Sequence, residues 1–289
     1  PAMPQVLPES PATESIRYHG LDALRAGAML LGVVLHVALY FQETAAASDP
    51  IWPIRDVQRS PLAGPLVIAI HIFRMPLFFV MAGFFIGLLH DRRGTRGVVT
   101  NRFRRIGIPF VIGWCVLFPL VKIAFSFAYM LGEGLDLSAA AGFAVGTVLA
   151  EGVWADPAPI HLWFLYYLLM LYVGMLVLGL GLRLVPPLHR RIDAWVRNVM
   201  TSRSRLPILV GVTFGLLTLM DGPTADTPDT FEPQIRVLLY YGFYLLVGWA
   251  LWNNRSLVAD LHRWSGLRTL AGTILLGITT IMTIGWFVV

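Results

Sequence analysis

Residues 63–89 read AGPLVIAIHIFRMPLFFVMAGFFIGLL. This stretch is long enough to cross a bilayer, because a membrane-spanning helix needs about 20 mostly apolar residues. Only two of its residues are ionisable, His71 and Arg74. Six further apolar blocks occur along the chain, at 24–41, 106–131, 161–185, 206–220, 234–252 and 269–289. We therefore predict an all-α, polytopic integral membrane helical bundle with about seven to eight transmembrane helices.

The composition agrees with this prediction and excludes a soluble globular domain. Of the 289 residues, 56% are hydrophobic and 13% are charged, whereas soluble domains carry about 25% charged residues. Twelve of the 22 Lys and Arg residues lie in two segments, 90–105 and 183–205. That clustering is typical of charges that orient helices in a bilayer, so the net charge of +5 does not predict a nucleic-acid partner. The single cysteine, Cys115, excludes an internal disulfide.

The charge between the apolar blocks alternates in sign. The two arginine-rich segments should face the cytoplasm, whereas 132–160 and 221–232 contain acidic residues and no Lys or Arg and should lie outside. This alternation places the N-terminus in the cytoplasm. Residues 1–20 are polar and rich in proline, which predicts a flexible tail before a transmembrane domain at 21–289. Residues 135–150 are apolar but short, so we expect a re-entrant or interfacial segment rather than an eighth span.

The first apolar block carries Asp22, Arg25 and His36. At 100° per residue all three fall on one narrow helix face, with His36 about 16 Å beyond Arg25 along the axis. Ionisable groups inside spans cost several kcal/mol and indicate function by default. Each residue also has a simpler interpretation: a helix N-cap or a salt bridge with Arg25 for Asp22, snorkelling for Arg25, and an interhelical hydrogen bond for His36.

The next two blocks extend this set. His71 and Arg74 share a helix face at i, i+3, and Pro76 after them is expected to kink the helix. Arg74 lies too deep to snorkel, so we predict that it binds an anion or fixes a polar network. Arg102 and Arg105 lie one turn apart at the mouth of the third block, where positive-inside charge alone also explains them. Together these residues predict a graded basic path that ends in imidazoles and suits a polyanionic cytosolic donor.

Aromatic residues gather in the segments expected outside. Trp154, Trp163 and Tyr166, with His161 among them, could stack against sugar rings of an acceptor. The alternative is the aromatic belt that membrane proteins place at the interface. Two further cationic residues lie within apolar blocks, Lys122 and Arg236. We expect each to pair with a carboxylate or to snorkel.

Four motifs occur in an order and spacing that resemble the membrane acyltransferase 3 family. They are RYHGLDALRAGAMLLGVVLH at 17–36, HIFRMPLFFVMAGFF at 71–85, RFRRIGIP at 102–109 and HLWFLYYLLMLY at 161–172. Their form is most similar to the glucans biosynthesis protein C branch, whose members attach succinyl groups to periplasmic glucans. The resemblance implies acyl-CoA as a cytosolic co-substrate and a sugar hydroxyl outside as the acceptor.

The family's functional residues transfer by motif position. His36 matches the essential histidine of the first span, Arg25 and Arg74 match the arginines of the LR and FR motifs, and Arg102 with Arg105 matches the RxxR pair. The resemblance thus implies an acyl-CoA-dependent O-acyltransferase, with His36 as general base or transient acyl carrier. The arginines would form the acyl-CoA path.

Supporting roles are expected for Asp22, His71 and His161, and no metal or permanently bound cofactor is expected. Ala82 stands where the family usually has the serine of an SGF or SGY motif. The family branch has about ten spans, so we expect this chain to be incomplete at its C-terminus. The expected location is the inner or plasma membrane, as a multi-pass protein. A proton-coupled transporter or exporter, using the same arginines and histidines, is the alternative function.

Overall fold

The computed structural model describes residues 19–42, 56–222, 224–256 and 265–288. Within these ranges the regular secondary structure is helical, which confirms the predicted all-α class. The elements are α1 (His19–Tyr40), α2 (Ala63–Arg102), the π-helical η1 (Phe103–Gly107), α3 (Ile108–Gly132), α4 (Leu137–Glu151), the 3₁₀ turn η2 (Ile160–Leu162), α5 (Trp163–Leu184), α6 (Pro186–Thr201), α7 (Arg205–Leu217), α8 (Ile235–Asn253) and α10 (Ser265–Val288). The expected tail, residues 1–20, lies outside the described residues except for its last two.

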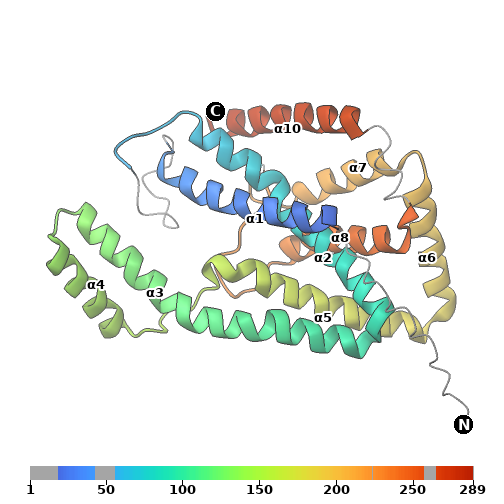
Figure 1. Cartoon of the computed structure of the whole chain (residues 1–289), viewed down its shortest axis with the longest axis horizontal. Coiled ribbons are helices and arrows are strands. Elements are labelled where there is room, and N and C mark those ends of the chain that lie inside the picture. The colour runs from blue at the N-terminus through green and yellow to red at the C-terminus, as the bar shows by residue number, and fades with distance from the viewer. Residues whose placement is uncertain (1–18, 43–55, 223, 257–264, 289) are drawn as a thin grey trace, which may run out of the picture.

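Among the residues that the structure describes, four continuous helical stretches are long and apolar enough to cross a membrane: His19–Tyr40, Ala63–Gly132, Ile160–Leu184 and Ile235–Asn253. The second stretch turns back on itself, since it joins α2, η1 and α3, and α3 returns along the length of the molecule (Figure 1). The helices α4 and α7 are apolar but shorter. The total of seven to eight spans and the side of the N-terminus therefore stay predictions.

Apolar side chains cover much of the outer surface of these helices. Leu30 of α1, Val111 of α3 and Val177 of α5 are each more than half exposed. Large contiguous apolar surfaces are rare on soluble monomers, because they cost free energy in water. The same surfaces are at no disadvantage against lipid chains, so the exposed residues support a membrane location.

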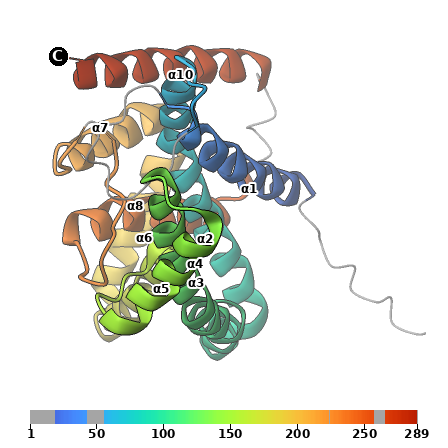
Figure 2. The same ribbon diagram turned by 90° about the vertical axis from the view of Figure 1, so that its left-hand side faces the viewer.

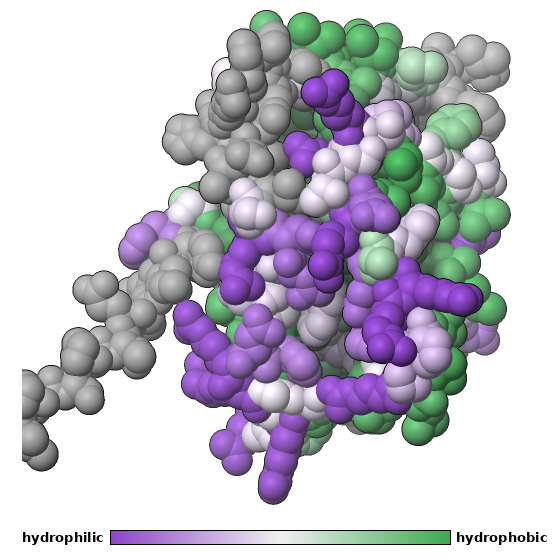
Figure 3. All heavy atoms as spheres, turned by 90° about the vertical axis from the view of Figure 1, so that its right-hand side faces the viewer, coloured by the Kyte–Doolittle hydropathy of each residue, from purple (hydrophilic) through white to green (hydrophobic). Residues whose placement is uncertain are grey.

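The two ends of the molecule are formed by different helices. α3 and α5 run along the long axis, and α6 lies across the end of α5 (Figures 1 and 2). Figure 3 looks at this end and shows hydrophilic residues over much of it. α4 lies beside α3 at the opposite end, where its buried face is Ala140, Ala144 and Val148.

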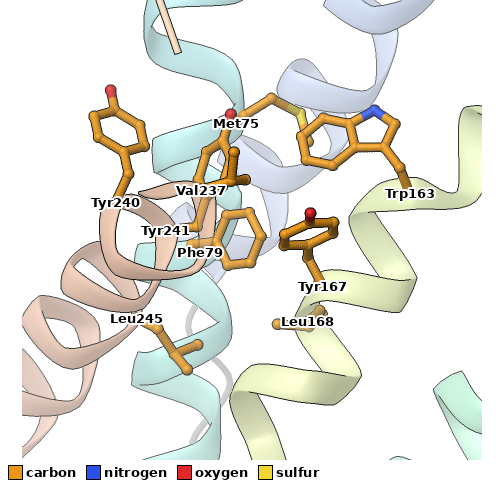
Figure 4. Close-up of a cluster of buried hydrophobic side chains, with 9 residues drawn as sticks. All are labelled: Met75, Phe79, Trp163, Tyr167, Leu168, Val237, Tyr240, Tyr241 and Leu245. Atoms are coloured by element: carbon orange, nitrogen blue, oxygen red, sulfur yellow. The ribbon is translucent and has the colours of Figure 1, made fainter. Parts of the chain in front are cut away.

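A buried cluster holds α2, α5 and α8 together (Figure 4). At its centre Phe79 of α2 stacks on Tyr241 of α8, with ring centroids 4.5 Å apart. Tyr167 of α5 is also fully buried, and its hydroxyl accepts a hydrogen bond from the backbone N–H of Gln234 at 3.0 Å. This core fixes α5 relative to α2, and so it fixes the helices that surround the site described below.

Two glycines allow α2 and α8 to approach at backbone distance. A Cβ at Gly83 would collide with the carbonyl oxygen of Leu245, and a Cβ at Gly248 would collide with that of Val80. Small residues serve helix packing in membranes in this way, because there is little hydrophobic driving force between helices in lipid.

The arginine-rich segment 90–105 differs from the expected connection between helices. α2 continues through it to Arg102, with one non-helical residue, Gly94, whose φ is +63°. Glycine reaches this conformation without steric cost, so the chain bends there and resumes its helix. The π-helical η1 follows, in which the N–H of Ile108 bonds to the carbonyl of Phe103.

Candidate active site

A cavity of about 1760 Å³ lies between α1, α2, α3 and α5. At one end it is lined by arginines, and we call this the basic end: Arg25, Arg92, Arg93, Arg102, Arg104 and Arg105. At the other, called the acidic end, it is lined by Glu151, Asp156 and Asp229, together with Lys122. Between them lie His36, His71, Arg74 and His161. Residues far apart in sequence therefore share one space.

Two histidines meet in the middle of this cavity. The rings of His36 and His161 have centroids 5.1 Å apart and an interplanar angle of 64°, so one ring faces the edge of the other. His36 comes from the last part of α1, and His161 comes from the 3₁₀ turn η2 that leads into α5. The sequence indicated each of them separately, but nothing in it predicted that they form a pair.

Arg74 lies one helical turn from His36. A Cβ at Gly32 would collide with Nη1 of Arg74, which means that the guanidinium rests against the bare backbone of α1 at this residue. Gly32 and His36 are four residues apart and lie on successive turns, about 6 Å along the axis. The guanidinium also donates from Nη2 to Sδ of Met75 at 3.8 Å. Among the described residues Arg74 forms no ion pair with a carboxylate.

His71 points toward the connection between α7 and α8. Its Nε2 lies 3.4 Å from the carbonyl oxygen of Ala225 and 3.4 Å from Oγ1 of Thr227. These contacts help to close the cavity on the side of α8, because Thr227, Pro228 and Asp229 line it. His71 and Arg74, at positions i and i+3 of α2, thus line the same cavity but contact different residues.

At the basic end, the arginines come from three elements: Arg25 from α1, Arg102 from the end of α2 and Arg105 from η1. Arg102 lies over the ring of Tyr172 of α5, with Cζ 5.3 Å from the ring centroid. Arg105 is exposed and free to contact a molecule that enters. π-helical turns such as η1 are often found at functional sites, and Arg105 lies within this one.

The segment before His161 is fixed by two residues of α3 that the sequence did not assign to the site. Trp114 donates its indole N–H to the carbonyl of Ala158 at 2.8 Å, and Lys122 donates to the carbonyl of Ala155 at 3.1 Å. Ile160, next to His161, has a φ of +47°, which is strained for a β-branched residue. The two hydrogen bonds from α3 therefore help to hold a strained segment that places His161 opposite His36.

The aromatic residues expected on the acceptor side occupy three different environments. Trp154 is about half exposed, and its ring stacks with Phe118 at 6.0 Å. Trp163 lines the cavity but is 8% exposed and belongs to the buried core. Tyr166 does not line the cavity; its hydroxyl donates to the carbonyl of Phe231 at 2.9 Å.

Comparison with known proteins identifies the family. Residues 18–288 match the acyltransferase domain of the acyltransferase 3 family. The chain belongs to the acyltransferase 3 family. This membership supports a membrane acyltransferase.

The curated relatives of this acyltransferase 3 chain include the glucans biosynthesis protein C of several Escherichia coli strains, among them SMS-3-5, K12 and O1:K1. Each is 33% identical over 95 residues, which are 33% of this chain and 23% of the relative. The alignment thus spans less than a quarter of these relatives. No solved structure matches the chain significantly.

Three smaller expectations are settled by the positions of the side chains. Asp22 is not an N-cap, because α1 begins at His19 and Asp22 lies inside its first turn. Among the described residues Asp22 also forms no ion pair with Arg25. Both line the cavity. Arg236 pairs with two carboxylates, Asp221 and Asp226, whereas Lys122 serves the backbone contact described above.

Proposed function

We propose that this protein transfers an acyl group, of acetyl or succinyl type, from cytosolic acyl-CoA to a hydroxyl of an extracytoplasmic carbohydrate such as a periplasmic glucan. One observation carries the proposal: a single cavity joins an arginine-rich end to a pair of histidines and then to an acidic end. A donor and an acceptor that approach from opposite ends would meet at His36. The name of the relatives, glucans biosynthesis protein C, supports a glucan as the acceptor.

The basic end suits the nucleotide part of acyl-CoA. Arginine pairs with phosphate through both charge and the geometry of its planar fork. Arg102 and Arg105 line the basic end of the cavity, and Arg25 belongs to the same lining. In the proposed complex these side chains bind the phosphates, and the pantetheine arm carries the thioester toward His36.

At the centre, His36 acts as a general base in the simplest mechanism. Its neutral imidazole accepts the proton of the acceptor hydroxyl while the hydroxyl oxygen attacks the thioester carbonyl. The tetrahedral intermediate then collapses, the carbon–sulfur bond breaks, and the proton passes from His36 to the leaving thiolate. The ring of His161 meets that of His36, so His161 would orient His36 or exchange the proton with it.

Arg74 would stabilise the negative charge that forms on the carbonyl oxygen. Preorganised positive groups near a developing oxyanion are worth several kcal/mol in a site that excludes water. The surroundings of Arg74 support this role, because its guanidinium lies one turn from His36 and is not neutralised by a described carboxylate.

The acidic end would receive the acceptor. Trp154, stacked on Phe118, offers an exposed aromatic face of the kind that packs against sugar rings. Asp156 and Asp229 add hydrogen-bond acceptors for hydroxyl groups along the cavity. Trp163 lines the cavity, whereas Tyr166 supports this end through its hydrogen bond to Phe231.

Vesicles that contain the protein test the proposal when they are given radiolabelled acyl-CoA on one side and a glucan on the other. His36→Ala is expected to lower covalent transfer of label by about 100- to 10,000-fold, the usual contribution of a general base. His189→Ala is the matched control, because His189 lies on α6 outside the cavity and is exposed. It is expected to leave the rate unchanged.

The same assay separates the alternatives. Label that crosses the bilayer without becoming attached to the glucan would support a transporter instead. Full activity in His36→Ala would refute the role of this residue. If His36 is an acyl carrier rather than a general base, label without acceptor will accumulate on the wild-type protein and not on His36→Ala.

A further inference from the structure

The helix α6 carries an amphipathic pattern that the proposed function does not use. At 100° per residue, Leu188, Ile192, Trp195 and Val199 fall within an arc of about 60°. The opposite side of the helix is polar and carries arginines, among them Arg190 and Arg197. The apolar stripe is largely uncovered, since Leu188 and Ile192 are exposed and Trp195 is 64% exposed.

The connections of α6 keep it at the level where the neighbouring helices end. Only Val185 separates it from α5, and only residues 202–204 separate it from α7. α5 belongs to a stretch that is apolar enough to cross a membrane, and α7 is a shorter apolar helix. α6 therefore cannot move far from the membrane surface, and it lies across the end of α5 (Figure 1).

The inner edge of the helix is already attached to the protein. Met200 is buried, and its carbonyl accepts a hydrogen bond from Nη1 of Arg205 at 3.3 Å. The outer edge of the stripe, with Leu188 and Trp195, has no such cover. The apolar stripe thus meets whatever surrounds the protein at this depth.

We propose that α6 is an interfacial helix that binds the headgroup region of an anionic lipid bilayer. Tryptophan and aliphatic side chains of such helices enter the boundary of the acyl chains, while arginines pair with lipid phosphates. The charge fits this partner. Six arginines lie on α6 and its two flanks, Arg183, Arg190, Arg191, Arg197, Arg203 and Arg205. The one acidic residue of α6, Asp193, pairs with His189 at 3.3 Å.

Spin labels on the full chain in lipid nanodiscs test this proposal. Two cysteine variants are made in a Cys115→Ser background: Ile192→Cys on the apolar stripe and Ala194→Cys on the polar side. Both residues are exposed, so neither change disturbs the packing. We expect the label at 192 to collide mainly with oxygen, which dissolves in lipid, and the label at 194 to collide mainly with a water-soluble nickel chelate. The ratio of the two collision rates should differ severalfold between the sites.

A second comparison tests the charge. With the label at 192, the oxygen preference should be stronger in nanodiscs that contain phosphatidylglycerol than in nanodiscs of phosphatidylcholine alone. Arg190→Gln combined with Arg197→Gln should remove that difference.

Three results would overturn the proposal. Equal collision ratios at 192 and 194 would show that α6 is not at the lipid boundary. An equal oxygen preference in nanodiscs with and without phosphatidylglycerol would exclude an anionic partner. Dipolar broadening between labels at 192 would show that a second copy of the chain covers the stripe.

Discussion

Gly32→Ala is expected to lower acyl transfer without lowering stability. The new Cβ would collide with Nη1 of Arg74, so the guanidinium must move by about 1.5 Å to reach an ordinary contact distance. At an effective dielectric constant of about 20, the attraction between two charges falls from about 4 to about 3 kcal/mol when their separation grows from about 4 to 5.5 Å. A loss of about 1 kcal/mol in the transition state corresponds to a rate lower by about 5- to 10-fold.

Gly27→Ala is the matched control for this change. Gly27 lies in the same helix, and nothing lies within 4 Å of a Cβ placed there. Both substitutions remove a glycine from a helix interior, which stabilises a helix by about 0.5–1 kcal/mol. Thermal unfolding should therefore show that neither variant is destabilised, whereas only Gly32→Ala should lose activity.

The assay is the rate of label transfer to glucan in vesicles, with Arg74→Ala as a second background. If Gly32→Ala acts by moving Arg74, it should have no further effect once Arg74 is removed, since the two changes affect one interaction. Equal transfer rates for Gly32→Ala and Gly27→Ala would refute the reasoning. So would a loss that persists undiminished in the Arg74→Ala background.

Three further predictions concern the donor, the histidine pair and the helix crossing. Arg105→Gln should raise the KM for acyl-CoA by about 10-fold or more, which is the value of a charge-assisted hydrogen bond. It should not raise the KM for acyl-pantetheine, which lacks the phosphates. Arg203→Gln, outside the cavity, should change neither KM. Trp114→Phe should lower kcat about 5-fold, because it removes one hydrogen bond worth about 1 kcal/mol from the segment that places His161; an unchanged kcat would contradict that role. Gly83→Ala should destabilise the protein by at least about 1–3 kcal/mol, because the new Cβ collides with a backbone carbonyl. The measurement is a fall in melting temperature. Gly179→Ala, where a Cβ meets no other atom within 4 Å, should not show this fall.

The sequence predicted the helical class and a set of candidate site residues, because both leave local signals. Apolar blocks of membrane-spanning length indicate helices in lipid, and ionisable residues inside them are rare enough to indicate function. The periodicity of the first block placed Arg25 and His36 on one face, and both residues line the cavity. Local periodicity cannot show which other helix will pack against this face.

The contacts of the site were therefore decided by the tertiary structure. His161 lies 125 residues after His36, and the two rings meet only because the core of α2, α5 and α8 fixes the start of α5. Gly32 had no sequence signal at all, since its importance depends on Arg74 of another helix.

The sequence by itself determined that this protein is a helical membrane chain, and it singled out the charged residues that are candidates for the site. Both inferences follow from the cost of placing a charge in an apolar medium. This cost depends on the residue type and its immediate neighbours in the sequence, so the sequence alone reveals it. Only the tertiary structure decided that one cavity joins the arginines to the histidines and that α6 lies across the end of the bundle. The physical reason is that helix packing depends on the shapes of two surfaces at once, including bare glycines and hydrogen bonds between distant segments.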